Sequence, residues 1–257
     1  MADKKEAEPV GDDSKLGRRG FVKLCASAIA IISASPKLLA QGDATLRRFN
    51  RVKLANNWGR PLKYSDLEVG QSYVFLYPFI TTPCFLINLG KPTEKATELK
   101  TEAGQTYYWR GGVGPQRSLV AFSAICAHQM THPTRSVNFI NYRHEAVRFQ
   151  DKRKTTAERS QIIYCCSERS VYDPANGARV IGGPAPQPLA AILLEYEEHN
   201  DNLYASGIYG GNMFDQFFDT FRVRLELEHL TSEIRKEVVD TAAVVPVDEY
   251  CQTQVLC

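Results

Sequence analysis

Short apolar runs separated by turn-forming residues dominate the chain between residues 49 and 211. Runs rich in aromatic and β-branched side chains are typical of short strands, and the Gly, Pro and Asn residues between them are typical of tight turns. The spacing predicts an all-β fold, a small antiparallel barrel or sandwich, with a loop or hairpin at 91–104 and a long polar insertion at 129–160. The clearest expected strands cover residues 73–77, 84–87, 106–109, 118–122, 162–165, 180–181, 191–195 and 203–207.

After Gly211 the pattern changes to a helical period. We expect a helical extension and tail over residues 212–257, with the aromatic stripe packed into the core. The apolar residues at this spacing are Met213, Phe214, Phe217, Phe218 and Phe221, followed by Leu230, Ile234 and Val238.

The first forty residues resemble a twin-arginine export signal. Arg18 and Arg19 are followed by Phe21, Lys23 and an uncharged run at 24–35. This run is shorter than the roughly 20 residues that cross a bilayer comfortably, so cleavage near residue 40 and retention as a membrane anchor both stay open. We therefore expect a periplasmic protein, a signal at 1–40 and a main domain at 45–211.

The charge distribution argues against nucleic acid as a partner. The chain has 31 Lys and Arg against 29 Asp and Glu, and residues 1–40 account for the whole excess. The exported part is therefore neutral, whereas proteins that grip a phosphate backbone carry clustered positive charge.

Two segments carry side chains suited to a metal centre. The first is Cys126-Ala127-His128, and the second runs from Cys165 to Tyr172, with a Gly-Pro-Ala turn further on. These segments resemble the two cluster-binding loops of the Rieske iron–sulfur proteins, and the match over about 49–211 is closest to respiratory types such as the arsenite oxidase small subunit.

The resemblance implies a [2Fe–2S] cluster, in which one iron takes two thiolates and the other two imidazoles. It assigns Cys126 and Cys165 as thiolate ligands and His128 as one imidazole ligand. It also implies that the Ser170 and Tyr172 hydroxyls donate hydrogen bonds to the cluster. The turn at Gly183 and Pro184 would cover it.

The sequence departs from the family at the fourth ligand, where Glu168 replaces histidine. Glu168 can ligate iron itself, Cys166 can substitute as a third thiolate, or the cluster is absent and the fold is a scaffold. Recruitment of His132 or binding of a different metal is a further alternative. The optional family disulfide is also missing, because Thr131 and Ser167 stand at its positions.

The remaining cysteines suggest structural roles. Cys84 lies in an apolar strand, which predicts a buried thiol. Cys251 and Cys257 can pair with each other or bridge to another chain. The basic residues of the insertion are more consistent with a solvated face than with a docking patch for an acidic redox partner; they are Arg143, Arg148, Lys152, Arg153, Lys154 and Arg159.

The predicted function is electron transfer. An exported Rieske-like subunit would pass single electrons within or to a membrane-associated oxidoreductase, its partner, through an altered [2Fe–2S] centre. The alternative is a cluster-free structural or assembly subunit of such a complex. An oxygenase component fits less well, because those enzymes are cytoplasmic and no second iron site is evident.

Overall fold

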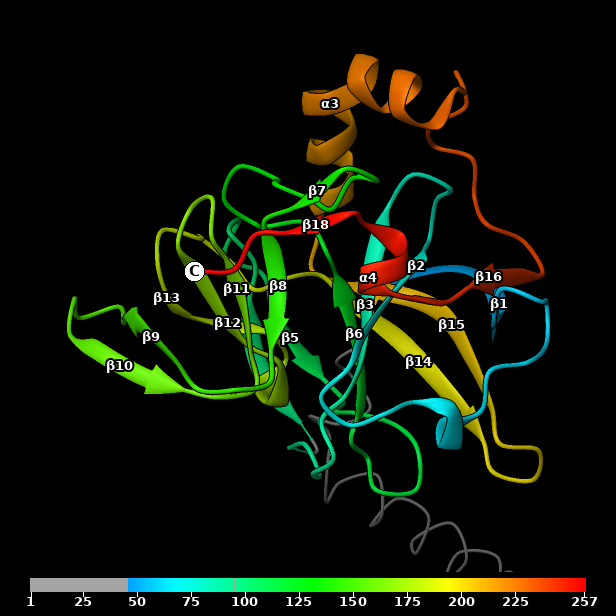
Figure 1. Ribbon diagram of the computed structural model, residues 1–257, viewed down its shortest axis with the longest axis horizontal. Coiled ribbons are helices and arrows are strands. Elements are labelled where there is room, and N and C mark those ends of the chain that lie inside the picture. The colour runs from blue at the N-terminus through cyan, green and yellow to red at the C-terminus, as the bar shows by residue number, and fades with distance from the viewer. Residues whose placement is uncertain (1–45, 95) are drawn as a thin grey trace, which may run out of the picture. The chain divides into compact units, whose positions relative to one another are not determined.

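The largest sheet has eight strands in the order β16-β1-β15-β14-β6-β3-β2-β17 (Figure 1). The computed structural model describes residues 46–94 and 96–257, so the expected export signal lies outside the described residues. β16 pairs with β1 at one end of the sheet and also contacts β2, next to the other end, so the sheet curls into a nearly closed barrel. Its strands are β1 (Arg47–Ala55), β2 (Ser72–Leu76), β3 (Pro83–Asn88), β6 (Leu119–Ser123), β14 (Ala191–Glu197), β15 (Asn202–Tyr209), β16 (Thr241–Ala243) and β17 (Val245–Pro246).

A second, four-stranded sheet in the order β13-β12-β11-β8 carries the second of the two cysteine segments. Its strands are β8 (Ile140–Arg143), β11 (Ile162–Cys165), β12 (Ser170–Asp173) and β13 (Arg179–Gly182). The smaller elements are η1 (Tyr64–Asp66), β4 (Thr97–Lys100), β5 (Thr106–Trp109), β7 (Val137–Asn138), β9 (Val147–Gln150), β10 (Thr156–Arg159), η2 (Pro174–Asn176), α3 (Met213–His229), α4 (Val247–Tyr250) and β18 (Thr253–Gln254).

The core lies inside the barrel and beneath the flanking elements. Every residue of β3 and of β6 is buried, so these central strands read as continuous apolar runs rather than alternating ones. Each fully buried Phe, Leu or Ile contributes about 1.5–3 kcal/mol relative to exposure. Cys84 is among these buried residues and its thiol is free, as predicted.

The prediction of an all-β fold with a C-terminal helix is confirmed. The polar insertion, however, contains strands that its composition did not predict. β9 and β10 form a hairpin that projects away from the four-stranded sheet (Figure 1). Arg148 and Glu158 pair across this hairpin at 2.9 Å, and its basic side chains are largely exposed.

The helix is shorter than its apolar spacing predicted. Phe214, Phe217 and Phe218 are buried, so the aromatic stripe packs into the core. The helix ends at His229, and the residue that caps it, Leu230, adopts a left-handed conformation with φ of 50°. The prediction that the helical spacing continues through Ile234 and Val238 is wrong, because residues 236–238 instead form backbone hydrogen bonds with residues 78–80. Within the described residues, no helix is long and apolar enough to cross a membrane.

Candidate metal centre

The first cysteine segment forms a tight loop after β6. The Cys126 N–H donates to the Thr131 carbonyl at 2.8 Å, and the Met130 N–H donates back to the Cys126 carbonyl at 2.9 Å. Met130 has a φ of 61°, a left-handed conformation that is uncommon for a side chain of this size. The backbone therefore closes the turn and fixes the direction of Cys126 and His128.

The second segment is the turn between β11 and β12. Cys165 pairs with Ser170 at the end of this antiparallel ladder, and residues 166–169 form the loop between them. Arg169 has a φ of 58°, so this loop also contains a left-handed residue. Backbone strain of this kind is typical of functional loops.

The two loops bring the thiols of Cys126 and Cys165 together. Both residues are fully buried, both are free of disulfides, and the two sulfur atoms are in hydrogen-bonding contact. Each sulfur also accepts a backbone N–H from its own loop, that of His128 for Cys126 and that of Glu168 for Cys165. Such donors stabilise the thiolate form, which is the form that binds metals.

Tyr172 adds a further donor to this pair. Its hydroxyl lies 3.2 Å from Cys126 Sγ and accepts the Ala127 N–H at 3.0 Å, so its own proton is directed at the sulfur. The contact with Cys165, followed by the Tyr172 hydroxyl and the backbone donor, lowers the pKa of the Cys126 thiol to about 7 despite burial. The same contact raises the pKa of Cys165, as does burial.

Glu168 and His128 form a second pair of candidate metal ligands. His128 Nδ1 lies 2.8 Å from Glu168 Oε2, which also accepts the Gln129 N–H at 3.1 Å. The Thr131 hydroxyl donates to Glu168 Oε1 at 2.6 Å. The Glu168 side chain is only 8% exposed. All of these contacts come from the first loop, so the carboxylate that replaces the family histidine points toward that loop.

Ser170 and Gly183 complete the surroundings of the thiols. Ser170 is fully buried, and its Oγ has no hydrogen-bond partner among the described residues. Gly183 has a φ of 76°, and a Cβ there would lie 2.1 Å from the Arg169 carbonyl oxygen, so only glycine allows this close approach. Pro184, next in the turn, is exposed.

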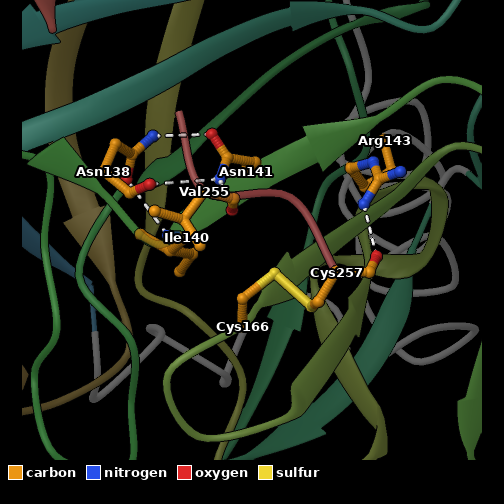
Figure 2. The surroundings of a disulfide bond; sticks show 7 residues. All are labelled: Asn138, Ile140, Asn141, Arg143, Cys166, Val255 and Cys257. Carbon is orange, nitrogen blue, oxygen red and sulfur yellow. Dashed lines mark hydrogen bonds between the residues drawn. A yellow bond between two sulfur atoms is a disulfide. The ribbon is translucent and has the colours of Figure 1, made fainter. Parts of the chain in front are cut away.

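Cys166 is not available as a ligand. It forms a disulfide with Cys257, with 5.6 Å between the Cα atoms (Figure 2). Adjacent side chains on an extended segment point to opposite faces, so Cys165 faces Cys126 while Cys166 faces the tail. Of the two alternatives for the tail cysteines, a Cys251–Cys257 pair is wrong, because Cys257 bonds to Cys166 and Cys251 is a free, buried thiol.

His132, the further alternative for a metal ligand, is also engaged elsewhere. Its ring is 4.8 Å from that of Phe217 and 5.4 Å from that of Phe221, so α3 covers it. Nδ1 lies 3.0 Å from the Met130 carbonyl oxygen, and Nε2 lies 3.6 Å from Glu228 Oε2. The apolar stripe of α3 was the signal in the sequence for such a partner.

Three contributors to the site were not predicted from the sequence: Thr131, the Gln129 N–H and Cys257. Thr131 stands where the Rieske family has an optional disulfide cysteine, and here a hydrogen bond to Glu168 joins the loops at that position. Within residues 46–94 and 96–257, no three or more His, Cys, Asp or Glu side chains gather around one point. The candidate metal ligands therefore form two separate pairs, Cys126 with Cys165 and His128 with Glu168, each with one residue from each loop.

Comparison with protein-family models gives no match. The iodate reductase subunit IdrB of Denitromonas iodatirespirans is 26% identical over 200 residues, which cover 78% of this chain and 85% of that protein. The crystal structure of the soluble domain of the Rieske protein II (soxF) from Sulfolobus acidocaldarius is 25% identical. It covers 63% of this chain and 81% of that chain, with a TM-score of 0.42.

The chain therefore resembles Rieske-type proteins in sequence. In the structure, the Tyr172 hydroxyl contacts Cys126 of the first loop, and the Gly183 turn approaches Arg169 of the second. Glu168, which replaces the family histidine, changes the type of candidate ligand but not the arrangement of the loops, which still converge.

Proposed function

We propose that this Rieske-like protein is an electron-transfer subunit of an oxidoreductase complex and holds an altered [2Fe–2S] centre. The observation that carries the proposal is the convergence of two donor pairs from two loops, Cys126 with Cys165 and His128 with Glu168. A binuclear cluster needs two protein ligands at each iron, which matches two pairs better than one group of four. When bound, such a cluster supplies one-electron transfer.

The sulfur pair fits a single iron. Two thiolates that bind one metal ion must come from positions facing the same point, and Cys126 and Cys165 already interact with each other from the two loops. Hydrogen bonds from Tyr172 and from the backbone N–H groups of His128 and Glu168 stabilise the negative charge of the thiolates. The buried, unpaired Ser170 hydroxyl is a donor in need of an acceptor, which an inorganic sulfide would provide.

Glu168 is proposed as the fourth ligand. Its Oε2 and the His128 Nδ1 converge on one another from opposite loops, and the two other candidates, Cys166 and His132, are held by the disulfide and by α3. The Gln129 N–H and the Thr131 hydroxyl orient the carboxylate. Such supporting contacts are what fix ligands in metal sites.

The partner and the location are proposed from the relative and from the export motif. The relative is named as a subunit of iodate reductase, which supports a catalytic partner subunit for this chain as well. The paired arginines at positions 18 and 19, in the segment that the structure does not describe, support export to the periplasm, with or without retention at the membrane.

Iron and acid-labile sulfide analysis, with low-temperature EPR on protein purified without oxygen, tests the proposal. We expect about two irons per chain and a rhombic signal after reduction. Cys126→Ser should abolish both, whereas Cys84→Ser, which alters a buried free thiol elsewhere in the barrel, should abolish neither. A folded, colourless and iron-free wild-type protein would overturn the proposal in favour of a cluster-free structural subunit.

A further inference from the structure

The segment that ends in Cys257 lies along the insertion that supports the second cysteine loop. β18 pairs in parallel with β7, and the Val255 N–H donates to the Asn138 carbonyl at 2.8 Å. Beyond β18, Asn141 Nδ2 donates to the Val255 carbonyl at 3.0 Å. Arg143 Nη1 donates to the Cys257 carbonyl at 2.7 Å (Figure 2). The tail is therefore seated on residues 137–143 up to the disulfide.

The second loop is attached to the same support. The Cys166 N–H donates to the Phe139 carbonyl at 2.7 Å, and β11 pairs with β8 up to Cys165 and Ile140. Residues 137–143 thus hold the tail on one side and the start of the loop on the other. The disulfide joins these two attachments at the residue directly after Cys165.

The position of this bond has a direct consequence for Cys165. Because adjacent side chains point to opposite faces, fixing Cys166 outward toward the tail fixes Cys165 inward toward Cys126. The bond also consumes the one other thiol in the loop, which would otherwise stand beside Cys165. Where the Rieske family can brace its two loops to each other with a disulfide, the loops of this chain meet through contacts of His128, Gln129 and Thr131 with Glu168.

We propose that Cys257, through its disulfide to Cys166, is a positioning residue for the second loop, holding Cys165 and Glu168 toward the first loop. Its relevance to electron transfer rests on the proposed function, whereas the effect on the loop is a property of the protein itself. The brace connects the loop to a segment 91 residues away, so it anchors the loop to the body of the fold.

Hydrogen exchange of the metal-free, oxidised protein tests the proposal directly. In Cys257→Ser we expect the amides of Cys166 and Glu168 to exchange at least about tenfold faster. Without the disulfide, the loop can open without moving the tail. Cys251→Ser, which alters a free thiol in the same tail, should leave these amides at the wild-type rate. Wild-type protein treated with a phosphine reductant should behave as Cys257→Ser does, which covers the case in which that variant does not fold.

Wild-type rates for Cys166 and Glu168 in Cys257→Ser, or in the reduced wild type, would overturn the proposal. So would a free Cys257 thiol in a non-reducing digest. In cluster-bearing protein, Cys257→Ser should broaden or shift the EPR signal, and Cys251→Ser should not. If the wild type holds no iron, the proposed function fails while the exchange result still decides the role of Cys257.

Discussion

Thr131 Oγ1 donates to Glu168 Oε1 at 2.6 Å and joins the two cysteine loops at their tips. Both residues stand at positions where the Rieske motif has other side chains, a cysteine and a histidine. A hydroxyl bonded to a carboxylate is a short, charge-assisted contact, worth about 1.5–3 kcal/mol in typical cases. The two departures from the motif are thus complementary, since the carboxylate gains an oriented donor and the loops regain a connection.

Replacing Glu168 by His should raise the reduction potential. The carboxylate adds one negative charge relative to a neutral imidazole, so accepting an electron is harder in the wild type, which we expect near the plant-type value of about −400 mV. In Glu168→His the potential should increase by on the order of 100 mV or more. A redox titration followed by EPR measures this shift.

Glu168→Ala separates ligation from orientation. Loss or alteration of the reduced EPR signal is expected, because the second iron loses an oxygen donor. Thr131→Val is the matched control, since it keeps the carboxylate but removes its hydroxyl donor. A Glu168→Ala spectrum identical to that of the wild type would remove Glu168 from the ligand set.

Tyr172→Phe should lower the potential and destabilise the fold. The hydroxyl directs its proton at Cys126 Sγ and accepts the Ala127 N–H, so its removal leaves a buried donor unpaired at a cost of about 1–3 kcal/mol. Tyr107→Phe is the control, because the Tyr107 hydroxyl is buried without a hydrogen-bond partner among the described residues. Urea unfolding and a redox titration of both variants measure the two effects, and equal results for the two variants would contradict this role of Tyr172.

Gly183→Ala should displace the turn that covers the second loop. Its Cβ would lie 2.1 Å from the Arg169 carbonyl oxygen, a contact that requires backbone movement. We expect a loss of about 1–2 kcal/mol from the left-handed conformation and about 1–3 kcal/mol more from overpacking. Gly104→Ala supplies the comparison, since Gly104 has a φ of 79° but nothing within 4 Å of its Cβ position. In thermal unfolding, the melting temperature of Gly183→Ala should be well below that of Gly104→Ala.

Acidification should weaken the contact between α3 and the first loop. The His132 ring, and then Arg224, lower the pKa of Glu228 from its ordinary value of 4.5 to about 2. A depressed folded-state pKa stabilises the protein above the unfolded value, so this contribution is complete above about pH 5 and is lost as the pH falls from 4.5 toward 2. Glu228→Gln should be less stable than the wild type at neutral pH, and the difference should vanish at the acid end.

Urea unfolding across this pH range measures the Glu228 effect. Glu226→Gln removes a neighbouring carboxylate that pairs with Arg222 on the same helix, and it serves as the control. If the free energy of unfolding of the wild type and of Glu228→Gln varied with pH in parallel, the contact with His132 would not contribute to stability.

Much of the barrel could be predicted because its strands are continuous apolar runs. Residues 84–87 and 118–122 are apolar at nearly every position, which only a buried strand or a longer buried helix explains, and their length favours strands. The cysteine loops could be located because their residue types follow a fixed spacing. Their convergence could be seen only in the fold, since Cys126 follows β6 of the eight-stranded sheet and Cys165 ends β11 of the four-stranded sheet.

The contacts made by the tail could not be predicted in the same way. A cysteine pairs with whichever thiol the fold brings near, so the sequence, which left the partner of Cys257 open, did not indicate Cys166. The helical spacing of Leu230 and Ile234 was outweighed by hydrogen bonds to residues 78–80, a long-range effect that periodicity does not register. The surroundings of His132 are likewise a long-range effect, because the residues that cover it, Phe217 and Phe221, lie in α3.

Two very short strands, β16 and β17, follow one another directly and yet occupy opposite ends of the eight-stranded order. The stretch from Thr241 to Pro246 therefore acts as the seam of the barrel, covering β1 on one side and β2 on the other. A proteolytic cut within these six residues would uncover two sets of unpaired backbone donors and acceptors at once. Exposed edges of this kind recruit strands from other molecules, so the seam protects the protein against self-association.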